Sequence, residues 1–194
     1  MRKHRVKILK TLFLIAFALL VVFGGFRLLM NQLYPLEYQE TILEYSRENN
    51  LDPAFVFAVV KCESGFDPNA LSSVEAKGLM QLTDETFQWL QTKTEDKENY
   101  PPEKLFDPQT NIRYGTLLLR MHLDEFDSPE LALAAYHAGR GKVNEWIDNS
   151  QHAKDDMEYI QYEDTQKYVK KVLETQKLYQ RLYTKQLEDG KQKS

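Results

Sequence analysis

One short segment, 54–60, is apolar on every side. A helix without a polar face is buried inside a globular protein. Asp52 and Pro53 precede the segment as an N-cap residue and a proline at the first helical position. Gly65 follows it as a typical C-terminal stop. The pattern therefore predicts a buried helix that begins after Asp52 and ends before Gly65.

The other apolar residues recur at helical spacing, as at Tyr38, Ile42 and Tyr45. Further helices are predicted at 37–49, 84–94, 108–126, 131–136, 142–147 and 164–183, with a surface loop at 95–103 and an irregular stretch at 148–162. A strand of useful length with period-two alternation is absent from the sequence. The fold class is therefore mostly α, with room for a small β element at 71–77 or 148–162.

The N-terminus has the pattern of a membrane anchor. Five basic residues lie within the first ten, and an uncharged apolar run of 16 residues follows at 11–26. This run makes about 24 Å of helix, and Arg27 can snorkel so that 28–30 add length. Residues 1–31 are predicted to be a cytoplasmic basic tip and transmembrane signal anchor, and 32–36 a short stalk. The alternative is a cleaved signal peptide, but Gly24-Gly25 is the only small pair.

Charge places the rest of the chain outside the cytoplasm by the positive-inside rule. Six of the 25 basic residues and none of the 29 acidic residues precede Asn31, so the remainder carries a net charge of −10. This balance argues against nucleic acid, which requires a basic surface. We expect a single-pass cell-membrane protein and a monomer, with an extracytoplasmic domain at 37–185 and a polar tail at 186–194.

Glu63 is the unusual residue because it falls in the last turn of the predicted buried helix. Desolvation and the negative end of the helix dipole both disfavour its ionised form and should raise its pKa. A carboxylic acid still protonated near neutral pH can protonate a leaving group. The ordinary alternative is a surface glutamate that caps the helix, pairs with Lys61 or faces solvent.

Three blocks of the sequence resemble the catalytic domain of the soluble lytic transglycosylases (SLT), a lysozyme-like family related to goose-type lysozyme. They lie in the family order and comprise Glu63-Ser64-Gly65-Phe66, Asn69-Ala70, Ser72 and Gly78-Leu79-Met80-Gln81; then Ala135-Tyr136-His137-Ala138-Gly139; then Thr165, Tyr168-Val169 and Val172. The resemblance implies a helical lysozyme-like domain that cleaves peptidoglycan glycan strands.

The resemblance also implies roles for individual residues. Glu63 would be the single acid/base that cleaves the bond between N-acetylmuramic acid and N-acetylglucosamine without water or a cofactor, leaving a 1,6-anhydro end. The substrate-binding residues would be Ser72, Gln81, Tyr136, His137 and Tyr168. For Ser72 the ordinary alternative is a turn hydroxyl that bonds its own backbone. The chain departs from the family at His137, where the family has asparagine, and at Glu75, where it often has glycine.

Two alternatives stay open at this point. A lysozyme-type muramidase on the same fold needs a second carboxylate, for which Glu75 and Asp67 are the nearest candidates. An inactive, membrane-tethered wall-binding module needs none. No metal site is predicted, because the four histidines have no carboxylate or cysteine partners at ligand spacing.

Overall fold

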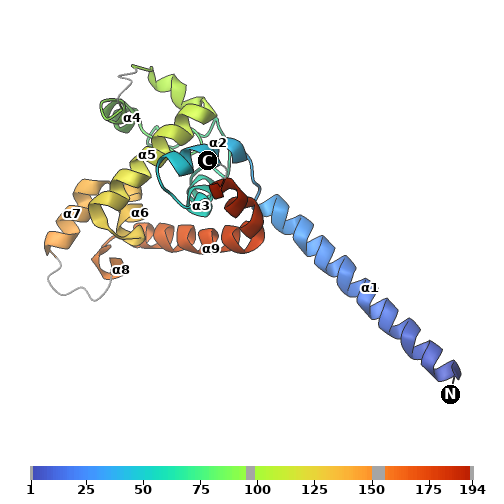
Figure 1. Ribbon diagram of the computed structural model, residues 1–194. Coiled ribbons are helices and arrows are strands. Elements are labelled where there is room, and N and C mark those ends of the chain that lie inside the picture. Colours follow the sequence, from blue (N-terminus) through green and yellow to red (C-terminus); the bar gives the residue numbers. More distant parts are fainter. Residues whose placement is uncertain (1, 95–98, 150–155, 193–194) are drawn as a thin grey trace. The chain divides into compact units, whose positions relative to one another are not determined.

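The computed structural model describes residues 2–94, 99–149 and 156–192. The chain divides into two compact units, Met1–Glu37 and Tyr38–Ser194. In the first unit, helix α1 (Arg2–Leu33) contains the segment Leu12–Leu33, which is long and apolar enough to cross a membrane by length and composition (Figure 1). The predicted apolar helix is therefore present, and it extends into the predicted stalk.

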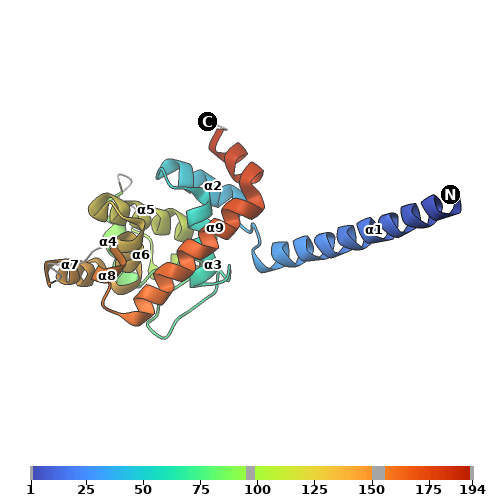
Figure 2. The same ribbon diagram turned by 90° about the horizontal axis from the view of Figure 1, so that it is seen from below.

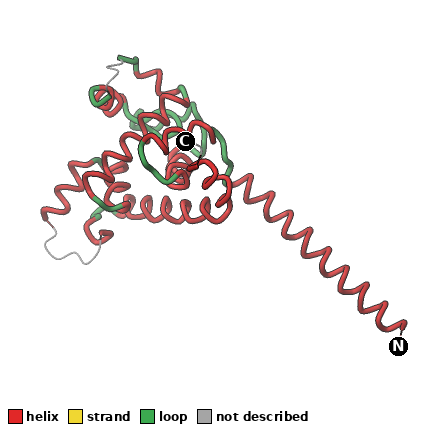
Figure 3. Tube along the Cα trace, viewed as in Figure 1, coloured by secondary structure: helices red, strands yellow, loops and turns green. Residues whose placement is uncertain are grey.

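The second unit is helical. Its elements are α2 (Gln39–Glu48), α3 (Pro53–Glu63), α4 (Asp84–Gln91), the short 3₁₀ helix η1 (Pro102–Phe106), α5 (Pro108–Phe126), α6 (Pro129–Ala138), α7 (Arg140–Asn149), α8 (Asp156–Tyr159) and α9 (Glu163–Gln192). The described residues contain no strand (Figure 3), only isolated bridges that join Lys77 to Leu71 and to Leu82. The mostly α fold class is confirmed, and the small β element lies at one of its two predicted places.

Helix α3 is the centre of the core, as its all-round apolar pattern predicts. Its first eight residues are all buried. The long helix α9 lies beside it (Figure 2), and the Phe57 ring stacks on Tyr179 with the centroids 5.3 Å apart. Asp52 caps α3 by accepting a hydrogen bond from the Ala54 N–H, and it also accepts one from Gln180 of α9. Helix α9 therefore holds α3 both at its start and along its length.

Some predicted element bounds are wrong. The helix predicted at 142–147 begins earlier, because α7 starts at Arg140, directly after the positive-φ residue Gly139, and continues through Gly141. The predicted loop ends in the short helix η1, whose first position is Pro102, a residue type suited to a helix start. Residues 95–98 of that loop lie outside the described residues.

The C-terminal part of the chain is more helical than its sequence indicates. Asp156–Tyr159 forms the short helix α8 within the stretch predicted to be irregular, of which 150–155 lie outside the described residues. Helix α9 runs past the predicted end at Tyr183 to Gln192, with non-helical backbone angles at Tyr183. Tyr183 and Leu187 are both buried, so apolar burial continues into the segment that composition suggests is a polar tail.

Candidate active site

Glu63 is the last residue of α3 and is only partly exposed. The chain turns away directly after it, through Gly65 with a φ of 63°. The Tyr168 hydroxyl of α9 donates a hydrogen bond to Glu63 Oε1 over 2.5 Å. The glutamate is therefore neither a solvated surface residue nor a partner of Lys61: the buried helix brings its carboxyl to a tyrosine 105 positions further along the chain.

The electrostatic environment of Glu63 favours its protonated form. Burial raises the pKa of Glu63 to about 7, although the Tyr168 hydrogen bond and the Lys171 ammonium both act to lower it. Desolvation is the main cause, as expected from the position of Glu63 at the end of a buried helix. Near neutral pH both the protonated and the ionised form are therefore populated, and the group can both give and take a proton.

The segment Leu79–Met80 connects Glu63 to helix α6. The Ser64 hydroxyl, next to Glu63, donates to the Leu79 carbonyl over 2.8 Å. The Tyr136 hydroxyl of α6 donates to the Met80 carbonyl over 2.7 Å. Burial and the nearby Glu63 raise the pKa of Tyr136 well above its usual value, so Tyr136 keeps its proton. These two bonds hold the end of α3, the loop and α6 together around the carboxyl.

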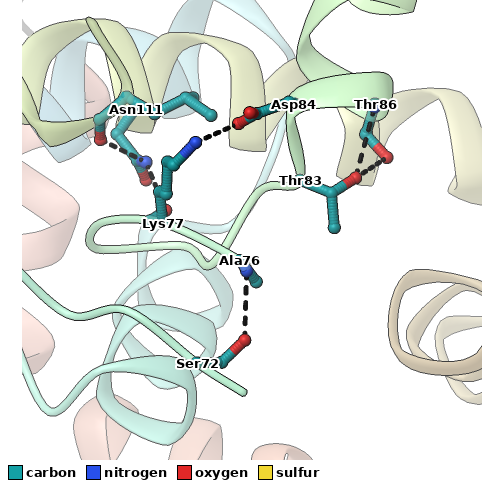
Figure 4. A network of polar contacts seen from close by, with 8 residues as sticks. Ser72, Ala76, Lys77, Thr83, Asp84, Thr86 and Asn111 are labelled. Carbon is teal, nitrogen blue, oxygen red and sulfur yellow. Dashed lines mark hydrogen bonds and ion pairs between the residues drawn. The ribbon is translucent and has the colours of Figure 1, made fainter. Parts of the chain in front are cut away.

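Asn111 anchors the same loop, and sequence reasoning missed it. Its amide is fully buried on α5 and donates to the carbonyls of Lys77 (2.9 Å) and Leu105 (2.8 Å), the first of which is drawn in Figure 4. Its Oδ1 accepts from the Met80 N–H over 2.7 Å. A buried amide on a helix face that also carries Ile112 and Leu119 is a polar exception, and that exception is the signal that could have identified Asn111.

Ser72 and Gln81 both bond to the backbone of their own loop. Ser72 Oγ accepts from the N–H groups of Val74 (3.2 Å) and Ala76 (3.0 Å; Figure 4). Gln81 Nε2 donates to the carbonyl of Gly78 over 2.9 Å. The turn-hydroxyl alternative for Ser72 is therefore observed. Contact of either side chain with a sugar stays a prediction.

His137, near the end of α6, lies against Tyr168. The two rings stack with centroids 4.5 Å apart and planes inclined by 26°. Nδ1 of His137 lies 3.1 Å from Thr165 Oγ1. Burial lowers the pKa of His137, and Asp164 opposes that shift, so the imidazole is neutral at neutral pH. Three of the five predicted binding residues, Tyr136, His137 and Tyr168, thus surround Glu63 or its hydrogen-bond partner.

The arrangement can be compared with known proteins. A model of the transglycosylase SLT domain matches residues 40–159. The chain belongs to this family. The match runs from the second residue of α2 to the end of α8, so the family resemblance is confirmed. The first two sequence blocks lie within the match, and the third, at 165–172, lies beyond it.

Individual relatives of this SLT chain are larger proteins. The soluble lytic murein transglycosylase of Salmonella typhimurium is 30% identical over 148 residues, covering 74% of this chain and 23% of the relative. The membrane-bound lytic murein transglycosylase C of Shigella sonnei is 33% identical over 116 residues, covering 55% and 32%. An X-ray structure of an inactive glutamate-to-glutamine mutant of the lytic transglycosylase Slt from Pseudomonas aeruginosa superposes with a TM-score of 0.70 at 31% identity, covering 76% and 24%. The chain spans about a quarter of the length of the first and third of these.

The two candidates for a second carboxylate are both exposed in the SLT domain. Glu75 has a φ of 61°, a left-handed conformation that favours glycine. This conformation is consistent with the glycine that the family often has at this position. Asp67 accepts a hydrogen bond from the Asn69 N–H over 2.9 Å, as a turn-forming aspartate does. Neither has the burial that sets Glu63 apart.

Proposed function

We propose that this SLT-family chain is a peptidoglycan lytic transglycosylase that cleaves the β-1,4 bond between N-acetylmuramic acid and N-acetylglucosamine and leaves a 1,6-anhydro end. The observation that carries the proposal is Glu63, a largely buried carboxyl with a pKa of about 7 and a hydrogen bond from Tyr168. The names of the Salmonella and Shigella relatives support the same activity. The inactive glutamate mutant of the Pseudomonas relative supports a glutamate as the essential group.

The reaction needs one carboxyl in two protonation states. Protonated Glu63 gives its proton to the bridging oxygen, and the bond between that oxygen and C1 of the muramic sugar breaks. The resulting carboxylate then takes the proton of the C6 hydroxyl, whose oxygen bonds to C1 and closes the anhydro ring. A pKa near the working pH suits both steps. The Tyr168 hydrogen bond stabilises the carboxylate formed in between.

We propose that Ser72, Gln81, Tyr136, His137 and Tyr168 bind the glycan. Tyrosine and histidine rings offer faces for sugar rings, and a glutamine offers both a donor and an acceptor for sugar hydroxyls. For the three aromatic residues the support is their position: Tyr168 bonds to Glu63, His137 stacks on Tyr168, and Tyr136 lies near enough to Glu63 for its charge to raise the tyrosine pKa. For Ser72 and Gln81 the support is their match to the family blocks and their place in the loop that follows α3.

Hydrolysis is the less supported alternative. An inverting or retaining glycosidase places two carboxyl groups on opposite sides of the scissile bond. Glu75 and Asp67 are exposed, and Asp67 is engaged in its own turn. A wall-binding module without activity would have no use for a buried carboxyl with a strongly raised pKa, a feature that is concentrated at catalytic sites.

The proposal can be tested by asking whether oxygen from water is incorporated at the new glycan ends. Purified peptidoglycan is digested with the full-length protein in ¹⁸O-labelled water, beside a hydrolytic muramidase as a control. We expect the new ends made by this protein to carry no ¹⁸O, while those made by the muramidase are labelled. Labelled ends from both enzymes would establish hydrolysis.

The pH dependence follows from the raised pKa of Glu63. The reaction begins with protonated Glu63, so kcat/KM should fall as the pH rises through about 7. A glutamate with an ordinary pKa would be ionised well below that pH. The measurement is the initial rate of fragment release between pH 5 and 9. A rate that keeps rising up to pH 9 would mean that the ionised carboxylate starts the reaction.

We also propose that α1 anchors the chain in the cell membrane with the SLT domain on the outer side. The apolar segment of α1, the six basic residues at its N-terminal end and within it, and the membrane-bound Shigella relative support this arrangement. Protease added to protoplasts, whose wall has been removed and whose membrane is intact, should digest the SLT domain. Protection of the domain until the membrane is lysed would contradict the proposed orientation.

A further inference from the structure

The Glu63–Tyr168 hydrogen bond depends on the orientation of the Tyr168 ring. The hydroxyl sits at the far end of that ring, so a small tilt of the ring moves it away from Glu63 Oε1, 2.5 Å distant. Tyr168 is partly exposed as a residue, while its hydroxyl is buried, which raises its pKa well above the usual value. A side chain packed against a face of the ring therefore restricts where the hydroxyl can lie.

His137 covers the ring of Tyr168. The imidazole comes from α6 and stacks at a centroid distance of 4.5 Å. It is itself held by Thr165, whose Oγ1 lies 3.1 Å from Nδ1 and which is 1% exposed. Thr165 and Tyr168 are three positions apart on α9 and so lie on the same helix face. One turn of α9 thus contacts the imidazole at two points.

The contact depends on the ring that this chain carries at position 137. An asparagine there, as in the family pattern, has no aromatic face with which to cover Tyr168. His137 is also exposed as a whole residue and lines a cavity of about 540 Å³. Its place is therefore not explained by filling the hydrophobic core.

We propose that His137 is a positioning residue for the Glu63–Tyr168 pair: stacked on Tyr168 and bonded to Thr165, it keeps the tyrosine hydroxyl on the carboxyl. Its role in catalysis rests on the proposed function, since the pair then acts in proton transfer. Removing the imidazole leaves Tyr168 free to tilt and weakens the hydrogen bond to Glu63. The expected consequence is a slower chemical step, beyond the weaker glycan binding that follows from the loss of a proposed binding residue.

Several charged and titratable groups surround Glu63 and Tyr168 and influence the pKa of Glu63. Glu63 faces Tyr136 of α6 and Tyr168 and Lys171 of α9, and Cys62 precedes it on α3. His137 faces Asp164 of α9. The Tyr168 hydrogen bond lowers the pKa of Glu63, so loss of that bond raises it.

The direct test is the pKa of Glu63 in the full-length protein in detergent micelles, followed by ¹³C NMR of glutamate carboxyls. Glu63→Gln identifies the resonance. We expect Tyr168→Phe and His137→Ala both to raise the pKa of Glu63 above that of the wild type. His137→Phe keeps a stacked ring without the Thr165 contact and should bring the pKa back toward the wild-type value. Failure of phenylalanine to bring it back would overturn the role of the stack.

A double substitution separates positioning from a general structural effect. In a Tyr168→Phe background, His137→Ala should cause no further change in the pKa of Glu63, because the hydroxyl through which it acts is gone. Tyr162→Ala is the matched control: it removes a ring that lines the same cavity but packs edge-on against Trp146, and should leave the pKa unchanged. An unchanged pKa in His137→Ala, or a shift that persists without the Tyr168 hydroxyl, would overturn the inference.

Kinetics give the second readout. His137→Ala should lower kcat roughly tenfold, because a misplaced catalytic group slows the chemical step, whereas loss of the proposed glycan contact alone would act on KM. A raised KM with an unchanged kcat would overturn the inference and leave His137 with the glycan contact alone. The NMR titration needs no substrate. If the protein cleaves no glycan, the proposed function fails while the titration still decides whether His137 positions the pair.

Discussion

Replacing Glu63 with glutamine should lower kcat for glycan cleavage by a factor of about 10²–10⁴, the usual contribution of a positioned general acid–base. Glutamine keeps the size of the side chain and can still accept the Tyr168 hydrogen bond, but it has no proton to give. KM should change little because the shape of the site is retained. The measurement is the rate of fragment release from purified peptidoglycan by the full-length variant.

Stability provides the control for this loss of activity. The pKa of Glu63 is raised to about 7 in the folded protein from the model-compound value of 4.5. The folded state therefore binds more protons between these pH values, and ionisation of Glu63 lowers the stability as the pH rises through them. Glu63→Gln should accordingly be more stable than the wild type at pH 8, by about 1–3 kcal/mol, and nearly equal to it at pH 4. A variant that loses activity because it unfolds would show the opposite.

Glu75→Gln is the matched control for charge. It removes an exposed carboxylate from the loop after α3 without removing a buried acid. Its kcat should remain within about twofold of the wild type, in line with the small effects of surface substitutions. A loss as large as that of Glu63→Gln would make Glu75 a second catalytic carboxylate and favour hydrolysis.

Gly78→Ala should destabilise the protein by about 3 kcal/mol or more. A Cβ at position 78 would lie 2.2 Å from the Leu105 carbonyl oxygen and 2.4 Å from the Asn111 amide nitrogen, and the φ of 74° is itself unfavourable for alanine. Relief of the overlap requires Leu105 or Asn111 to move, which weakens the bonds that hold the loop beside Glu63. Thermal unfolding should show a decrease in Tm of about 6–12 °C.

Gly65→Ala separates the two causes of the stability loss in Gly78→Ala, which are the steric overlap of the new Cβ and the positive φ. Gly65 also has a positive φ, of 63°, but a Cβ there meets no atom within 4 Å. Its substitution should therefore cost only the conformational part, about 1–2 kcal/mol. Equal losses of stability in the two variants would contradict the close packing of Gly78 against α5.

The features that local rules control could be predicted from the sequence. The all-round apolar pattern, the Asp52-Pro53 start and the Gly65 stop predict α3 and its burial, and the structure confirms all three. Glu63 follows from them as a carboxyl at the end of a buried helix, with a raised pKa.

The remaining features depend on contacts between distant segments. Tyr168 meets Glu63 only because α9 packs along α3, and Asn111 meets the Lys77–Met80 segment only because α5 passes behind it. The spacing of apolar residues along the sequence does not indicate which distant segments come together. The extension of α9 beyond Tyr183 was missed for a related reason, since the burial of Leu187 is set by the fold and its neighbours in sequence are polar.

The measurement that tests the central claim most directly is mass spectrometry of the fragments released from purified peptidoglycan by the full-length protein and by Glu63→Gln. The account predicts fragments with 1,6-anhydro-muramic ends from the wild type and none above background from the variant, with both proteins folded. Reducing muramic ends, or equal release by the two proteins, would contradict it: the first by establishing hydrolysis, the second by removing Glu63 from the chemistry.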